Sequence, residues 1–137
     1  MGFRAQILHH PFVEDEHKQA ESREAERFDS WVGSLPAADL EFARLVYTAL
    51  AGSSSTELRS IVAVRIQLLY RLDKQAALPL WRQLIDDPEE ENSDHACEGV
   101  ELEIEEGRLT EGEAAHLLAW VTAARDRWFL RDSGVEP

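Results

Sequence analysis

The stretch TELRSIVAVRIQLLYRL (residues 56–72) decides the fold of this chain. Its apolar side chains fall on nearly every side of a helical wheel, a pattern typical of a helix that is covered all round. The sequence therefore predicts a central helix with other helices packed around it. The apolar residues are Leu58, Ile61, Val62, Val64, Ile66, Leu68, Leu69 and Leu72.

Helical patterns continue on both sides of the central stretch. Gly33 is expected to end the first helix, and Pro36 suits the first turn of the second. Ser54 with Glu57, and Thr110 with Glu113, have the spacing of capping boxes. The predicted helices are 14–32, 36–51, 56–72, 74–85 after a cap at Asp73, a fifth opened by Asn92 or Ser93 and ended by Gly107, and a sixth up to residue 131.

One segment fits two periodicities. Val100 to Glu105 alternates apolar and acidic residues, as a half-buried strand does. On a helical wheel, however, Ala96, Cys97, Val100 and Ile104 share one sector, and Asp94, Glu98, Glu101 and Glu105 share another. No second convincing strand exists to pair with this one, and an isolated strand leaves its backbone groups without partners. A helix is therefore predicted here.

A helical hairpin is predicted within VRIQLLYRLDKQAALPLWRQLIDDPE (residues 64–89). Two apolar helices flank a turn at Asp73, and the Asp-Asp-Pro-Glu exit follows. This pattern resembles one HEAT repeat, which implies a stacked helical scaffold that binds proteins and carries no catalytic residues. A repeat buries its faces only against stacked neighbours, and the chain has no second clear copy. An irregular helical bundle is the alternative.

The fold class predicted for the 137 residues is all-α, one domain of five to six helices, arranged as an irregular bundle or a short HEAT-like stack. The expected boundaries are an irregular N-terminal segment over 1–13, a single helical domain over 14–131 and a frayed tail over 132–137. No apolar run approaches the ~20 residues that a membrane span requires. A signal peptide is not expected, and the single cysteine, Cys97, excludes an internal disulfide, so a cytoplasmic protein is predicted.

Negative charge is concentrated in one segment of the chain. Thirteen acidic residues and one base, Arg108, lie between Asp86 and Glu113, which leaves this segment with a net charge of −12 out of −13 for the chain. The other 109 residues hold 14 acids and 13 bases and are nearly neutral. Direct binding to nucleic acid is not expected, because phosphate backbones require positive charge.

The candidate partner-binding residues lie on one sector of the helix predicted within this segment. Carboxylates spaced three and four residues apart repel each other, at a cost of a few tenths of a kcal/mol per pair. A helix that keeps them is typical of a docking surface, although a solvated face that maintains solubility is the alternative. The predicted residues are Asp94, Glu98, Glu101 and Glu105, with Leu102 beside them as an apolar anchor.

Catalytic, cofactor-binding and metal-binding residues are not predicted. Cys97 lies on the apolar sector among carboxylates, which disfavour a thiolate, and a structural role is expected even though His95 and His116 are near in sequence or could approach in space. The five histidines lack metal-binding spacings, and the glycines form no phosphate-binding loop.

Two hypotheses follow, neither of them an enzyme. The first is an acidic protein-binding domain, such as an inhibitor, an immunity-type protein or an adaptor, that docks a basic partner, including one that itself binds nucleic acid. The second is a HEAT-like structural subunit of a larger assembly that binds through apolar helix faces. No membrane partner is expected, and the oligomeric state stays open.

Overall fold

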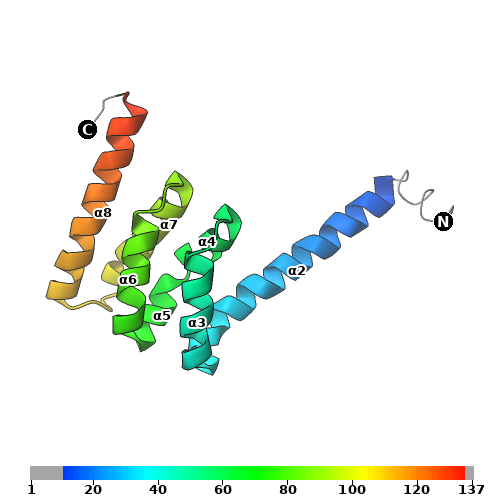
Figure 1. Cartoon of the computed structure of the whole chain (residues 1–137), viewed down its shortest axis with the longest axis horizontal. Coiled ribbons are helices and arrows are strands. Elements are labelled where there is room, and N and C mark those ends of the chain that lie inside the picture. Colours follow the sequence, from blue (N-terminus) through cyan, green and yellow to red (C-terminus); the bar gives the residue numbers. More distant parts are fainter. Residues whose placement is uncertain (1–10, 135–137) are drawn as a thin grey trace. The chain divides into compact units, whose positions relative to one another are not determined.

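The structure, a computed structural model, describes residues 11–134, and within them the side chains of residue 20 and of residues 23–134. The described residues form seven α-helices and no strand, which confirms the all-α class and exceeds the predicted five to six helices by one (Figure 1). The helices are α2 (Pro11–Ala38), α3 (Leu40–Ala51), α4 (Thr56–Ala63), α5 (Ile66–Leu72), α6 (Lys74–Ile85), α7 (Glu90–Glu105) and α8 (Glu111–Asp132).

The chain divides into two compact units, Met1–Trp31 and Val32–Pro137. In the first unit, the described part of α2 is mostly exposed, and the rings of Phe28 and Trp31 lie 5.7 Å apart. The single domain expected over 14–131 stays a prediction. Helix α2 begins at Pro11, three residues before the expected start, and α8 includes Asp132, whereas residues 1–10 and 135–137 of the expected N-terminal segment and tail lie outside the described residues.

In the second unit, the helices form two rows (Figure 1). Helices α3, α6 and α8 are neighbours in one row, with α6 between the other two. Helix α4 packs against α7 in the other row, and each row contacts the other through the pairs α3 with α4, α6 with α7 and α7 with α8. Successive antiparallel helices therefore stack side by side, with one apolar core between the rows.

Trp81 of α6 is the largest fully buried side chain of the core. Its indole Nε1 donates a 3.0 Å hydrogen bond to the carbonyl of Ala96 on α7, so its polar atom is satisfied inside the core. Tyr70 of α5 packs its ring against Trp81 with a centroid distance of 5.1 Å. Trp81 thereby connects α6 both to α7, through the hydrogen bond, and to α5, through the ring contact.

The single central helix predicted over 56–72 is wrong, because the chain turns at Val64 and Arg65 and divides it into α4 and α5. The Arg65 amide donates to the Val62 carbonyl in a tightened last turn. The Gln67 side chain donates through Nε2 to the Val64 carbonyl at 3.2 Å, which satisfies a backbone acceptor at the turn. This corner accounts for the additional helix.

The predicted end of the first helix at Gly33 and the start of the next at Pro36 are also wrong. Helix α2 continues through both residues to Ala38, and Asp39 caps α3 by accepting a hydrogen bond from the Phe42 amide. A proline inside a helix removes one backbone donor. In this case Tyr47 supplies a replacement donor.

Some of the predicted helix caps are confirmed. Asp73 caps α6, the Thr110–Glu113 capping box is complete at α8, and Gly107 follows α7 with φ +70°. Helix α6 continues through Pro79.

Other cap predictions are wrong. Ser55, not Ser54, caps α4 by accepting from the Leu58 amide. Glu89, rather than Asn92 or Ser93, stands at the N-cap position of α7. Asn92 and Ser93 are buried inside the helix, where their side chains donate to the backbone carbonyls of Thr56 and Ile85, respectively. No helix among the described residues is long and apolar enough to cross a membrane.

Candidate partner-binding face of helix α7

The helix predicted at Val100 to Glu105 is confirmed as the end of α7. Burial does not follow the alternation, because Glu103 is buried together with Val100, whereas Leu102 is exposed together with Glu101 and Glu105. The five predicted partner-binding residues, Asp94, Glu98, Glu101, Leu102 and Glu105, all lie on α7 and keep at least part of their side chains in solvent. The exposed carboxylates thus belong to one helix, as the wheel predicted.

Arg125 of α8 reaches back to this ridge and pairs with two of its members. Its Nη2 atom lies 2.6 Å from Glu101 Oε1 and 3.5 Å from Asp94 Oδ1. All three side chains are about half exposed, so these pairs contribute little to stability. They nevertheless cancel part of the negative charge that the sequence assigns to the ridge.

Glu98 and Glu105 are the exposed ridge carboxylates that pair with no Lys or Arg among the side chains that the structure describes. The pKa of Glu98 is raised above its ordinary value, first by a hydrogen bond with Asp94 and then by desolvation. The charged form of Glu98 is therefore disfavoured in the free protein, as expected for a carboxylate held beside another. A cation bound next to Glu98 would remove this penalty.

The charge concentration predicted for residues 86–113 is reduced by folding. Six of its thirteen acids pair with Lys or Arg, and five of the six bases involved come from outside the segment. Among the described residues, seven acids of the segment keep no such pair, so a smaller negative surface remains. The pairs are Asp86–Arg127, Asp87–Arg59, Asp94–Arg125, Glu101–Arg125, Glu103–Arg71 with Arg108, and Glu113–Lys74.

Glu103 is fully buried and holds the fold together rather than facing a partner. Arg71 of α5 binds it with two bonds, at 2.5 Å from Nη2 to Oε1 and 3.1 Å from Nε to Oε2. Arg108, in the loop after α7, adds a third bond of 3.0 Å to Oε1. A buried carboxylate with two guanidinium partners fixes α7 against α5.

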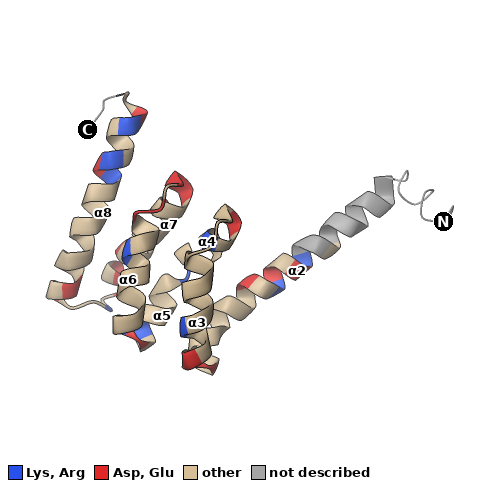
Figure 2. Ribbon diagram, in the orientation of Figure 1, with Lys and Arg blue, Asp and Glu red and all other residues tan. Residues whose placement is uncertain are grey.

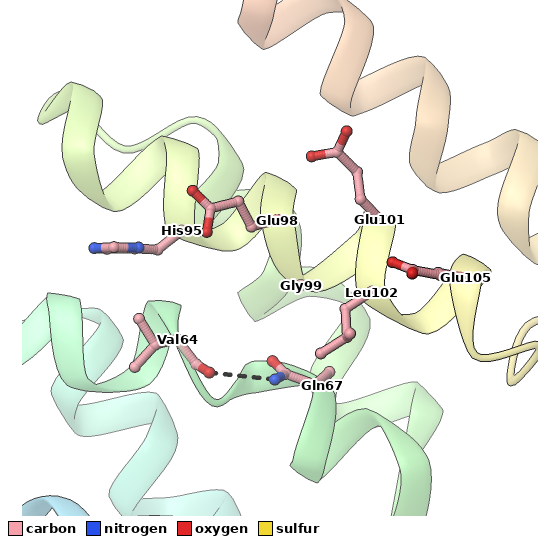
Figure 3. Close-up of a pocket in the computed structure, with 8 residues that line it drawn as sticks. All are labelled: Val64, Gln67, His95, Glu98, Gly99, Glu101, Leu102 and Glu105. Carbon is pink, nitrogen blue, oxygen red and sulfur yellow. Dashed lines mark hydrogen bonds between the residues drawn. The ribbon is translucent and has the colours of Figure 1, made fainter.

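The ridge borders a groove of about 360 Å³ between α7 and the corner that joins α4 to α5 (Figure 3). This volume lies at the low end of the range for binding sites. Three carboxylates line the groove, and His95 is the only lining residue that can carry positive charge. The lining residues are Val64, Gln67, His95, Glu98, Gly99, Glu101, Leu102 and Glu105.

The groove brings together four of the five predicted residues, Glu98, Glu101, Leu102 and Glu105, and leaves Asp94 outside. Leu102 extends from α7 toward Gln67, whereas Glu101 is directed away, toward α8 (Figure 3). Leu102 is 41% exposed, which places an apolar side chain at the wall of an acidic groove. Such a combination of an apolar wall and charged acceptors suits the side chain of a basic residue, whose stem is apolar.

Positive charge gathers elsewhere in the second unit. Figure 2 shows basic residues on the C-terminal half of α8 and acidic residues at the beginning of α7. On α8, the guanidinium groups of Arg127 and Arg131 lie 5.1 Å and 4.9 Å from the ring centroid of Trp128. These arginines are therefore directed to an aromatic ring on their own helix, and Glu98 and Glu105 are left to solvent.

Cys97 is 1% exposed and is not among the residues that line the groove. Burial raises the pKa of the Cys97 thiol, although a hydrogen bond from Arg125 opposes this effect. A buried thiol with a raised pKa is a poor nucleophile at neutral pH. Among the described side chains, no group of three or more His, Cys, Asp or Glu residues is arranged to hold a metal ion.

Val64, Gln67, His95 and Gly99 are groove residues that the sequence pattern did not indicate. Two of them were visible as local anomalies, since Gln67 is an uncharged polar residue in an apolar helix and Gly99 is a glycine in the middle of α7. Glycine at such a position costs about 1 kcal/mol relative to alanine. Position 99 nevertheless has little room for a side chain, because a Cβ there would lie 3.2 Å from Gln67 Oε1.

Comparisons of this chain with protein-family models, with curated proteins and with solved structures each found no match.

Proposed function

We propose that this chain is a non-catalytic protein-binding domain, of the inhibitor, immunity-type or adaptor kind, that docks a basic partner surface on α7. The observation that carries the proposal is the acidic groove, in which Glu98 and Glu105 face solvent without a Lys or Arg partner among the described residues. Leu102 adds an exposed apolar side chain between them. The proposed class of partner includes proteins that otherwise bind nucleic acid, since such surfaces carry clustered Lys and Arg.

Electrostatics supports this assignment in two ways. The net charge of −13 draws a basic partner toward the chain over long range, which raises the association rate at low salt. At short range, Glu98 gains a cation that relieves its repulsion with Asp94. Binding of this kind weakens as salt increases, because the Debye length falls to about 8–10 Å near physiological ionic strength.

The proposed role is non-catalytic, and the proposed location of the chain is the cytoplasm. The burial of Cys97 supports a non-catalytic role, since a nucleophilic cysteine requires an accessible thiolate. Its free thiol supports the cytoplasmic location, because cysteines stay reduced in the cytoplasm. Neither a cofactor nor a metal is part of the proposed activity.

The test measures binding of a fluorescently labelled ten-residue lysine-rich peptide by anisotropy at low and high salt. The test variant carries Glu98→Lys and Glu105→Lys. The matched control carries Asp126→Lys and Asp132→Lys, two exposed acids on α8, so both variants change the net charge by the same amount. Circular dichroism verifies that each variant stays helical.

The proposal predicts that the test variant loses at least about tenfold in affinity, equivalent to about 1.4 kcal/mol, while the control loses much less. Equal losses in the two variants would assign the interaction to net charge alone. That result would contradict a specific face on α7.

A second candidate function is a HEAT-like structural subunit that binds through apolar helix faces. The observation that favours it is the two-row stack, in which α3 and α8 lie at the two ends of one row. Both end helices carry large exposed apolar side chains, with Leu45 66% exposed on α3 and Phe129 70% exposed on α8. Stacked repeats bury such faces against neighbouring units.

Sedimentation velocity separates the two candidates. Association through Leu45 or Phe129 is apolar, so it persists at high salt and is lost in Leu45→Glu or Phe129→Glu. Docking at α7 has the opposite salt dependence and is unaffected by either substitution. A chain that stays monomeric at every salt and protein concentration would contradict self-assembly through these end helices.

A further inference from the structure

Gln67 occupies an unusual place at the floor of the acidic groove, between the α4–α5 corner and α7 (Figure 3). The residue is only 9% exposed. Its Nε2 atom donates to the Val64 carbonyl, but its Oε1 atom is buried and accepts no hydrogen bond from any described residue. A buried acceptor without a donor destabilises a protein, so native structures retain few of them.

This oxygen lies close to α7 at Gly99. Gly99 presents no side chain to it, and a Cβ at that position would lie 3.2 Å from Oε1. The amide cannot improve its own bonding by exchanging its two ends, because Oε1 would then face the Val64 carbonyl, which is also an acceptor. The missing partner is therefore a hydrogen-bond donor.

Every charged residue that lines the groove, apart from His95, is an acceptor as well. Glu98 and Glu105 are seven residues apart, which places them about 10 Å apart along the axis of α7. Leu102 lies between them in sequence and is directed toward Gln67 (Figure 3). The groove thus combines a neutral acceptor at its floor, a carboxylate toward each end and an apolar wall.

We propose that this groove binds one arginine side chain of the basic partner, with the guanidinium between Gln67 and a ridge carboxylate and the aliphatic stem against Leu102. This inference rests on the proposed function and specifies the residue that the α7 face recognises. Arginine presents five donors in one plane, so it contacts an amide oxygen and a carboxylate together. The second carboxylate, about 10 Å away, is left for another basic residue of the same partner.

Lysine fits this acceptor set less well. Its ammonium is a compact, strongly hydrated point charge, and reaching a buried amide oxygen would remove much of that hydration. A lysine therefore stays with the exposed carboxylates and leaves Gln67 without a donor. The proposed consequence is a preference for arginine over lysine that depends on Gln67.

The experiment compares three labelled ten-residue peptides by anisotropy, in which one central position of a lysine-rich sequence is arginine, lysine or citrulline. The intact chain is expected to bind the arginine peptide about tenfold more tightly than the lysine peptide. Citrulline keeps the shape of arginine without its charge, and its peptide is expected to bind more weakly than either. In Gln67→Leu the arginine preference should disappear, while the affinity for the lysine peptide stays within about twofold.

Two further variants guard against a folding defect at the buried position. Gln67→Met removes the same acceptor with a flexible side chain, and Leu102→Ala changes a residue outside the buried core. The first should abolish the preference, and the second should reduce it by removing the wall for the stem. A preference that persists in both Gln67 variants, with circular dichroism unchanged, would overturn the inference.

The outcomes also separate this inference from the proposed function. Equal binding of the arginine and lysine peptides, still sensitive to Glu98→Lys with Glu105→Lys, overturns the arginine site and leaves the basic-partner function in place. Absence of binding by all peptides contradicts both.

Discussion

The hydroxyl of Tyr47 on α3 donates a 2.8 Å hydrogen bond to the backbone carbonyl of Val32 on α2. In an α-helix this carbonyl would accept from the amide of residue 36, but Pro36 has no N–H to give. Burial raises the pKa of Tyr47 to about 12, so its hydroxyl keeps the proton that it donates. The tyrosine thus replaces the backbone bond that the proline removes.

Tyr47→Phe is therefore expected to destabilise the fold by about 1–3 kcal/mol, since it leaves a buried carbonyl without a donor. Pro36→Ala restores a backbone N–H at that place. In the Pro36→Ala background, Tyr47→Phe should cost at least about 0.5 kcal/mol less than in the natural sequence. Urea unfolding of the four proteins gives this coupling, and additive effects would refute the replacement.

A second stability prediction concerns the buried carboxylate of Glu103. Glu103→Gln is expected to cost about 3 kcal/mol, the lower end of the range for breaking a buried ion pair, because Arg71 and Arg108 can turn partly to solvent. Glu105→Gln on the exposed ridge is the control and should change stability by less than about 0.5 kcal/mol. Similar unfolding midpoints for the two variants would show that the Glu103 cluster contributes nothing.

The lowered pKa of Glu113 leads us to expect that the stability of the fold depends on pH. Lys74 in the first place, then the Thr110 amide and the Tyr70 hydroxyl, lower the pKa of Glu113 from 4.5 to about 2. A carboxyl whose pKa is lower in the folded state stabilises the fold above its ordinary pKa, and this contribution disappears as the pH falls from 4.5 toward 2. Glu113→Gln should lose stability at pH 7 and show a smaller further loss across that acid range, as thermal unfolding at several pH values will reveal.

Replacing Arg125 on the surface of α8 is expected to strengthen the binding of a basic peptide. It pairs with both Asp94 and Glu101, so Arg125→Gln frees two carboxylates beside the groove. Binding of a lysine-rich peptide is expected to strengthen by a few-fold, while stability falls by no more than about 1 kcal/mol. Weaker binding by this variant would argue that α7 does not present the docking charge.

Much of the fold follows from the apolar pattern of the sequence. The all-α class, the cap at Asp73 and the capping box at Thr110 depend on nearest-neighbour chemistry, which a single sequence displays. The passage of α2 through Pro36 depends on Tyr47, which lies farther along the chain and donates to the Val32 carbonyl. The turn at Val64 depends on a bond at the corner, from the Gln67 side chain to the Val64 carbonyl. Such tertiary replacements of backbone bonds cannot be recognised from local propensity.

The candidate site was predictable in part. The exposed sector of Glu98, Glu101 and Glu105 follows from helical periodicity alone. The pairing of Glu101 with Arg125 joins α7 to α8, and composition counts cannot reveal which charges meet across helices. For the same reason, the sequence overestimated the free charge of the segment and gave no sign of the groove beside Gln67.

The most direct test of the central claim is a map of backbone amide chemical shifts in the ¹⁵N-labelled chain as the lysine-rich peptide is added. The account predicts that the largest changes fall on residues 95–105 of α7 and on Val64 to Gln67 at the facing corner, and that they vanish in the variant with Glu98→Lys and Glu105→Lys. Changes centred instead on Leu45 and Phe129, or scattered over every acidic residue, would contradict it.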